Sequence, residues 1–145
     1  MILISHRGNL NGPQPENENS PDYIEKALLN YNVEIDIFFY KNELWLGHDN
    51  PEYKIKNLNW LENNKLWCHA KNLEALDKML KHPKIHCFWH QNDDVTLTSR
   101  GYMWTYPNKR LFSNSIAVIK EKLDKNVLPA CSGICSDYVE IINLK

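Results

Sequence analysis

The sequence lacks any apolar run close to the roughly 20 residues that a membrane-spanning helix requires. Its first residues, from Met1 to Arg7, also lack the basic region and the cleavage site of a signal peptide. We therefore expect no membrane span and a cytoplasmic location.

The sequence also lacks an excess or a cluster of basic residues. Its 17 Lys and Arg are spread along the chain, and against 18 Asp and Glu they give a net charge of −1. Nucleic acid, which is bound through a basic surface, is therefore not an expected partner.

The sequence contains no complete zinc-binding pattern among its four cysteines. The four cysteines lie in apolar or strand-like segments, where buried, reduced thiols are expected in a cytoplasmic protein. Cys131 and Cys135 are four residues apart, so pairing or metal binding stays an alternative. No second cysteine pair or nearby histidine completes a zinc site with them.

Length and composition bound the number of domains. The chain has 145 residues, of which 43% are hydrophobic and 24% charged, an ordinary globular balance. This length suits one hydrophobic core and is short for two, so residues 1–145 are predicted to form a single domain. A chain this short is expected to leave sheet edges thinly covered, and self-association into a homo-oligomer would bury them.

Short apolar runs alternate with helical patterns along the chain. Pro21 after Ser20 predicts a helix over residues 21–31, and Asn72 is the expected cap of a second helix that continues to Leu80. A turn or 3₁₀ segment is expected between Gln91 and Tyr102, and a weak helix over residues 120–123. Apolar runs predict strands at residues 2–5, 33–38, 44–48, 66–70, 85–90, 102–106, 115–119 and 133–139.

The alternation of strands and helices predicts an α/β fold with a mostly parallel sheet. The number of short apolar strands favours a compact TIM-type (β/α) barrel of seven or eight strands over a flat sheet. A full barrel of this type takes about 250 residues. The outer helices are therefore expected to be reduced or missing.

Two acidic residues interrupt the apolar strand predicted at residues 33–38. Glu34 and Asp36 are two positions apart and therefore share one face of that strand. Two buried carboxylates so close would repel each other unless a cation lies between them, and oxygen ligands favour Mg²⁺ or Ca²⁺. The alternative is an exposed strand whose two acids face water.

Histidine and arginine occur where two other predicted strands end. His6 and Arg7 follow the first strand, and His48 closes the strand at residues 44–48. A guanidinium matches phosphate oxygens, and an imidazole can transfer a proton near neutral pH. The alternative for each histidine is a hydrogen bond to a loop carbonyl with no functional role.

These residues belong to an ordered set of motifs. The set comprises His6-Arg7-Gly8, Glu18-Asn19-Ser20, Glu34-x-Asp36, Gly47-His48-Asp49, Lys71, Trp104-Thr105 and Cys135-Ser136-Asp137-Tyr138. In order and spacing it resembles the motifs of the glycerophosphodiester phosphodiesterase family, within the phospholipase C-like phosphodiesterase superfamily. The likeness spans most of the chain and is tightest over residues 5–50. It implies a metal-dependent phosphodiester hydrolase acting on a glycerophosphodiester or a similar small phosphodiester.

The resemblance also implies roles for single residues. His6 and His48 would be the general base and the general acid, on either side of a metal held by Glu34 and Asp36. Arg7 and Lys71 would bind phosphate oxygens. Trp104 is expected to contact the substrate for a separate reason, since an aromatic residue at the end of a predicted strand can form an apolar wall of the pocket; the alternative is that it only packs in the core.

One position departs from the family's pattern. The third carboxylate ligand, two residues before Lys71, falls on His69. A ring nitrogen could still bind the ion, and it would shift the preference from Mg²⁺ or Ca²⁺ toward Mn²⁺ or another transition ion. Together with the short chain, this departure leaves an alternative function: a catalytically degenerate barrel that binds a phosphorylated ligand without turning it over.

Overall fold

The structure is a computed structural model that describes residues 1–124 and 126–143. Within these residues the chain forms ten strands, three short α-helices and one 3₁₀ helix. In chain order they are β1 (Ile2–His6), α1 (Pro21–Leu28), β2 (Asn32–Tyr40), β3 (Glu43–Leu46), β4 (Tyr53–Lys54), η1 (Leu58–Glu62), β5 (Leu66–Ala70), α2 (Leu73–Leu80), β6 (Cys87–Trp89), β7 (Val95–Leu97), β8 (Met103–Thr105), β9 (Ser115–Ile119), β10 (Gly133–Ser136) and α3 (Val139–Asn143).

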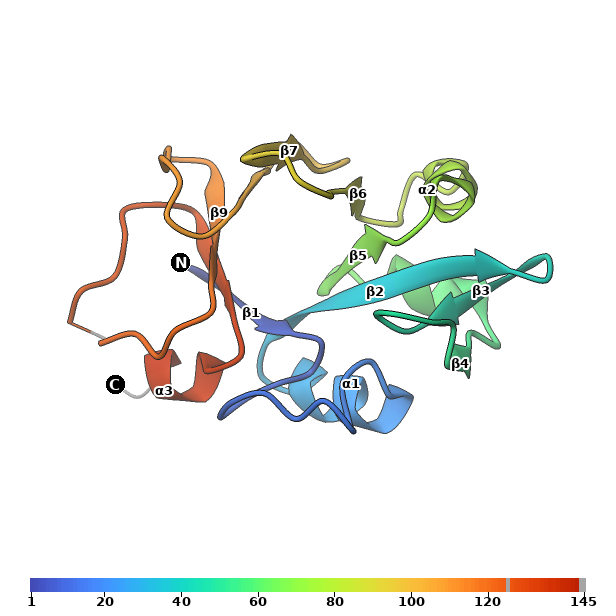
Figure 1. Ribbon diagram of the computed structural model, residues 1–145, viewed down its shortest axis with the longest axis horizontal. Coiled ribbons are helices and arrows are strands. Elements are labelled where there is room, and N and C mark those ends of the chain that lie inside the picture. Colours follow the sequence, from blue (N-terminus) through green and yellow to red (C-terminus); the bar gives the residue numbers. More distant parts are fainter. Residues whose placement is uncertain (125, 144–145) are drawn as a thin grey trace.

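The ten strands form one curled, mixed sheet (Figure 1). Its main path runs β4, β3, β2, β1, β10, β9, β8, β7, while β5 pairs with β2 and β6 pairs with β5. The run from β8 through β9, β10, β1, β2 and β5 to β6 is parallel. Strands β3, β4 and β7 are paired antiparallel. The sheet therefore curls into a half-barrel whose parallel strands all end at one rim.

The prediction of a TIM-type (β/α) barrel is wrong. The parallel path has an α-helix in only two of its described crossovers, α1 between β1 and β2 and α2 between β5 and β6, while the connection from β2 to β5 contains the β3–β4 hairpin and the 3₁₀ helix η1. Residues 106–114 join β8 to β9, and this is fewer than the dozen or more residues that a helical crossover usually needs. The described residues between β9 and β10 form no helix either, including the stretch 120–123 for which the sequence predicts one.

The segment between β6 and β8 also differs from the sequence-based prediction of a turn or 3₁₀ segment. Residues 95–97 form β7, which pairs antiparallel with β8 in a hairpin. Gly101, with φ of 82°, lies in the turn of that hairpin, and glycine adopts this conformation without a Cβ penalty. Just after β7, the Ser99 N–H donates to the carbonyl of Cys87 at 2.8 Å and so links the hairpin to β6.

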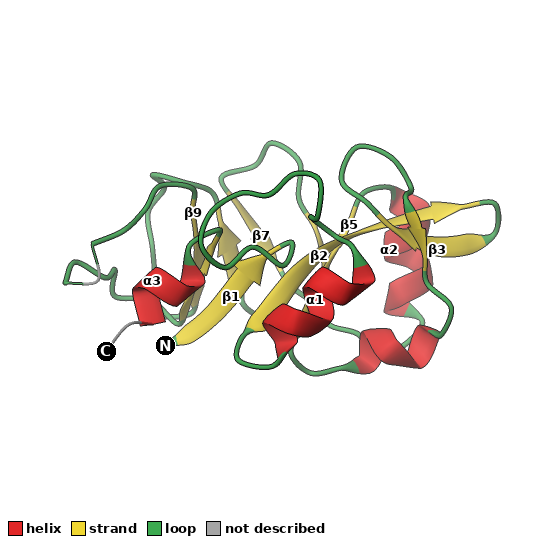
Figure 2. Cartoon of the chain, turned by 90° about the horizontal axis from the view of Figure 1, so that it is seen from below, coloured by secondary structure: helices red, strands yellow, loops and turns green. Residues whose placement is uncertain are grey.

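Two apolar clusters lie on opposite faces of the sheet. The outer cluster is covered by helices: α1 packs on β2, α2 packs on β2 and β6 (Figure 2), and its buried members, such as Ile35, Leu66 and Met79, all fall between Ile24 and Cys87. The inner cluster lies within the curl of the sheet. It consists of Ile4, Trp67, Phe88, Trp104, Ile116 and Cys135.

The second helix begins where the sequence predicts. The side chain of Asn72 accepts a hydrogen bond from the backbone N–H of Ala75 at 3.1 Å, which caps α2. The same side chain accepts from the N–H of Phe39 and donates to its carbonyl, so the cap also ties α2 to β2. The first helix ends at Leu28, three residues before its predicted end.

No helix in the described residues has both the length and the apolar character that crossing a membrane requires. The cytoplasmic location and the homo-oligomer stay predictions.

Candidate active site

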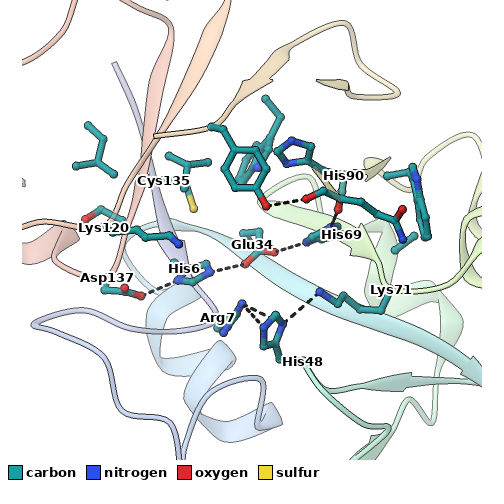
Figure 3. Close-up of a pocket in the computed structure, with 18 residues that line it drawn as sticks. His6, Arg7, Glu34, His48, His69, Lys71, His90, Lys120, Cys135 and Asp137 are labelled. Carbon is teal, nitrogen blue, oxygen red and sulfur yellow. Dashed lines mark hydrogen bonds and ion pairs between the residues drawn. The ribbon is translucent and has the colours of Figure 1, made fainter. Parts of the chain in front are cut away.

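A pocket of about 510 Å³ opens at the rim where the parallel strands end (Figure 3). The carboxyl ends of parallel strands are where α/β proteins place their ligands. Several of the polar lining residues stand at or just after the ends of different strands, namely His6, Lys71, His90, Tyr106, Lys120 and Asp137.

The register of three neighbouring strands brings the predicted metal ligands together. His6 on β1 is paired with Glu34 on β2, and Asp36 on β2 is paired with His69 on β5. Glu34 is 2% exposed and Asp36 is 0% exposed. The alternative of an exposed strand with its acids in water is therefore wrong.

Glu34, Asp36 and His69 each offer one ligand atom, and these atoms lie within 4.8 Å of one another. Nδ1 of His69 is 3.4 Å from Oε1 of Glu34 and 3.3 Å from Oδ1 of Asp36. Two buried oxygens of this group, Glu34 Oε2 and Asp36 Oδ1, have no hydrogen-bond partner among the described residues. Buried carboxylate oxygens are rarely left in this state, and the donor set fits a divalent cation.

The orientation of His69 follows from its second ring nitrogen. Nε2 donates to the carbonyl of His90 at 2.9 Å, since a carbonyl can only accept. The ring is also stacked on Phe88, with centroids 5.0 Å apart and an interplanar angle of 9°. Burial alone lowers the pKa of His69, but the close contacts with the carboxylates of Asp36 and Glu34 and their negative charge outweigh burial and raise this pKa to about 9.

Asp36 is the most heavily braced of these groups. Its Oδ2 accepts from Nδ2 of Asn19 at 2.9 Å, and its backbone N–H donates to Oδ1 of Asn19 at 2.9 Å. Nε of Arg7 also lies 2.9 Å from Oδ2, but its N–H is not aligned for a hydrogen bond, so this contact is an ion pair. Burial would raise the pKa of Asp36, but the close contacts with His48 and His69 and the charge of Arg7 hold that pKa well below its usual value.

Arg7, His48 and Lys71 form a cationic side of the pocket. Nη2 of Arg7 is 3.0 and 3.1 Å from the two ring nitrogens of His48, and Nζ of Lys71 is 3.2 Å from Nδ1. Gly47, directly before His48, has φ of 151°, and a Cβ there would lie 1.9 Å from the carbonyl oxygen of Asn50. The turn that presents His48 therefore requires glycine.

His6 is held by a residue to which sequence reasoning gave no role. Its Nδ1 lies 2.7 Å from Oδ1 of Asp137, and its Nε2 is 3.9 Å from Oε2 of Glu34. Burial lowers the pKa of His6, but the hydrogen bond to Asp137 and the charge of Glu34 outweigh it, so the pKa is raised. In the sequence Asp137 belongs to the motif Cys135-Ser136-Asp137-Tyr138 in the last predicted strand, but that motif does not show that β10 is the neighbour of β1.

Polar residues of the loop after β1 form hydrogen bonds that hold Arg7 and Asp137 in place. Glu18 accepts from Nη1 of Arg7 at 3.1 Å and from Nδ2 of Asn9 at 2.8 Å. Asn9 also donates to Asp137 at 2.8 Å. Glu18 and Asn19 stand in a quoted motif, but their bracing role could not be read from spacing alone.

Trp104 and Lys120 also line the pocket. Trp104 lines the pocket but is only 4% exposed, and its ring packs on Phe88 with centroids 4.5 Å apart. Most of the Trp104 side chain therefore packs in the inner apolar cluster, and only a small part of it faces the pocket. Lys120, which sequence reasoning missed because it ends an ordinary apolar strand, lines the pocket on the side of His6 (Figure 3).

With this geometry in view, the chain was compared with known proteins. No family model, no curated protein and no solved structure matches it. The comparisons therefore identify no family, and the resemblance to glycerophosphodiester phosphodiesterases stays a prediction from the sequence motifs.

Proposed function

We propose that this chain is a metal-dependent phosphodiester hydrolase that acts on a glycerophosphodiester or a similar small phosphodiester. The observation that carries the proposal is the convergence of Glu34, Asp36 and His69, with ligand atoms within 4.8 Å of one another, beside two histidines. His6 adjoins Glu34 at 3.9 Å, and His48 adjoins Asp36 at 3.5 Å. The resemblance of the motifs supports the same reaction.

A divalent ion would be held by Glu34, Asp36 and His69, and it would supply Lewis-acid stabilisation of charge on the phosphoryl oxygens. The oxygens Glu34 Oε2 and Asp36 Oδ1, which accept no hydrogen bond from any residue that the structure describes, are free to contribute to that binding. Asn19 keeps Asp36 oriented through two hydrogen bonds of 2.9 Å, so the carboxylate does not have to reorganise when the ion binds.

His6 is the proposed general base. The carboxylate of Asp137 accepts the Nδ1 proton, which leaves the lone pair of Nε2 on the side of Glu34. Nε2 takes the proton of the attacking hydroxyl while the new P–O bond forms. Asp137 then stabilises the imidazolium, the role that a buried carboxylate has in a Ser-His-Asp triad.

His48 is the proposed general acid, and it gives a proton to the leaving oxygen as the old P–O bond breaks. Arg7 and Lys71, whose nitrogens lie 3.0 and 3.2 Å from Nδ1 of His48, bind the non-bridging oxygens of the phosphate. The attacking hydroxyl belongs to water or to the substrate itself, and in the second case the first product is a cyclic phosphate.

Hydrolysis of glycerophosphocholine and of bis(p-nitrophenyl) phosphate, with and without divalent ions, tests the proposal. We expect ion-dependent turnover by the wild type and its loss in Glu34→Gln. Glu43→Gln is the matched control, because Glu43 pairs with Lys54 at the surface of the neighbouring hairpin, and it should keep wild-type turnover.

A wild type that is as inert as Glu34→Gln with several ions and diesters would contradict hydrolysis. In that case, calorimetry showing metal-dependent binding of a phosphorylated ligand would identify the chain as a degenerate binding protein.

A further inference from the structure

We propose that the centre formed by Glu34, Asp36 and His69 selects a first-row transition ion, such as Mn²⁺ or Zn²⁺, over Mg²⁺ and Ca²⁺. The inference rests on the proposed function, because it concerns the ion of that same site. It depends on the nitrogen ligand that His69 contributes and on how the fold fixes this ring.

The ring of His69 has one orientation and one tautomer that the surrounding chain favours. Nε2 carries a proton because it donates to the carbonyl of His90 at 2.9 Å. Nδ1 is then the atom that would offer a lone pair to an ion, and it lies 3.4 Å from Glu34 Oε1 and 3.3 Å from Asp36 Oδ1. Metal-binding histidines commonly donate their other ring N–H to a carbonyl in this way, which orients the ring and increases its basicity.

The spacing of the three donors suits one shared ion. Two ligands of a tetrahedral ion bound at about 2.1 Å lie about 3.4 Å apart. The separations of His69 Nδ1 from the two carboxylate oxygens are 3.4 and 3.3 Å. Both separations therefore match those of two donors on one ion, and all three ligand atoms lie within 4.8 Å of one another.

The donor types and their number disfavour the alkaline-earth ions. Ca²⁺ takes six to eight oxygen ligands, and Mg²⁺ prefers an octahedron of oxygens. The described residues supply a group of three donors, and one of them is a nitrogen in place of the oxygen that both alkaline-earth ions prefer. Imidazole instead favours transition ions, and carboxylates are compatible with Mn²⁺ and Zn²⁺.

Isothermal titration of the full chain with Mn²⁺, Zn²⁺, Mg²⁺ and Ca²⁺ tests the selectivity directly. In the wild type we expect Mn²⁺ to bind at least about tenfold more tightly than Mg²⁺. In His69→Glu the ratio of Mn²⁺ to Mg²⁺ affinity should fall at least about tenfold, the scale on which changes around a metal ligand act. His82→Glu, the same substitution outside the pocket and just after α2, should leave the ratio unchanged.

A second measurement can be made on the wild type alone, so its main result does not depend on the folding of a variant. Electron spin echo envelope modulation of Mn²⁺ bound to the wild type should show coupling to a nitrogen of a directly bound imidazole. His69→Gln, a neutral replacement, should remove that coupling, whereas His82→Glu should keep it.

The outcomes separate this inference from the proposed function. Ion-dependent hydrolysis that is as good with Mg²⁺ as with Mn²⁺, with no nitrogen coupling, would overturn the selectivity and leave the hydrolase proposal intact. Tight Mn²⁺ binding with nitrogen coupling but no turnover would support the selectivity and contradict hydrolysis. Binding of none of the four ions would overturn both.

Discussion

The two parts of the chain are built differently. In residues 1–90 the sheet carries α1 and α2 on its outer face, and the outer apolar cluster is drawn from this part alone. In residues 91–143 the described crossovers are loops or a hairpin, and the one described α-helix is the short α3, which packs on β1. This part supplies Trp104, Ile116 and Cys135 to the inner cluster.

This difference explains where the charged site lies. Glu34, Asp36 and His69 all stand on β2 and β5, the strands whose outer faces are held by helices and whose inner faces can therefore carry polar groups. The second part closes the pocket and adds single groups at its rim, namely Asp137, Lys120 and Trp104. Substitutions in the first part should therefore cost more than equivalent ones in the second.

The largest effect is expected for Asp36→Asn. It removes the charge that faces Arg7 and His69 in a fully buried position, so it should abolish metal-dependent turnover and lower the free energy of unfolding by about 3–5 kcal/mol. Asp94→Asn removes one partner of the exposed pair with Lys109 in the second part and should cost less than about 1 kcal/mol. Chemical denaturation of both variants measures their free energies of unfolding. Equal losses for Asp36→Asn and Asp94→Asn would contradict the proposed difference between the two parts of the chain.

Asp137→Asn tests whether the second part supplies a positioning residue. Loss of the carboxylate that holds Nδ1 of His6 should lower kcat by about 10³-fold, within the range for impaired acid–base catalysis. Because Asp137 acts through His6, adding Asp137→Asn to His6→Gln should reduce kcat little further. Steady-state kinetics of the two single variants and the double variant give the answer. Multiplicative losses would show that Asp137 acts independently of His6.

His86 joins the two parts and gives a pH-dependent prediction. Its ring packs on Trp67 with centroids 4.1 Å apart, and its Nε2 lies 2.8 Å from Oγ1 of Thr98. Burial and the charge of Arg100 lower the pKa of His86 from 6.5 to about 4. Between these values the unfolded chain binds a proton that the folded chain does not, so the free energy of unfolding should fall as the pH decreases, by up to about 3 kcal/mol.

His86→Gln should remove this part of the pH dependence. Denaturation curves at pH 7 and pH 4.5 should therefore differ less for the variant than for the wild type. An identical pH dependence in both proteins would show that the folded protein does not keep His86 neutral.

The smallest effect is expected for Lys120→Met. Lys120 lines the pocket and forms no ion pair with any other residue that the structure describes, whereas Arg7 and Lys71 already face Asp36. Its loss should raise KM for an anionic diester by about fivefold or less, with kcat little changed. Lys122→Met, just outside the pocket, is the control, and an equal change in KM for both variants would assign the effect to general surface charge.

Sequence reasoning succeeded where local patterns decide the structure. The run of residues 66–70 and the cap at Asn72 predicted β5 and the start of α2 correctly, because hydrophobic runs and capping residues act over a few positions. The two-residue spacing of Glu34 and Asp36 likewise placed both carboxylates on the inner face. These features required no knowledge of distant contacts.

The remaining features depend on which strands become neighbours. The hairpin of β7 and β8 replaces a parallel crossover, and β10 pairs with β1, which brings Asp137 to His6. Neither pairing leaves a mark in local sequence. The bracing of Asp36 by Asn19, across 17 positions, is hidden for the same reason. The failed barrel prediction has the same origin, since counting strands does not determine their direction.

The most direct test of the account is a crystal structure of the protein with Mn²⁺, using the anomalous signal to locate the ion. The account predicts a single strong site about 2.0–2.3 Å from Glu34, Asp36 and Nδ1 of His69, with His6 and His48 beside it. An ion bound elsewhere, with Nδ1 of His69 still in contact with the carboxylates of Glu34 and Asp36 and with no ion, would contradict the account.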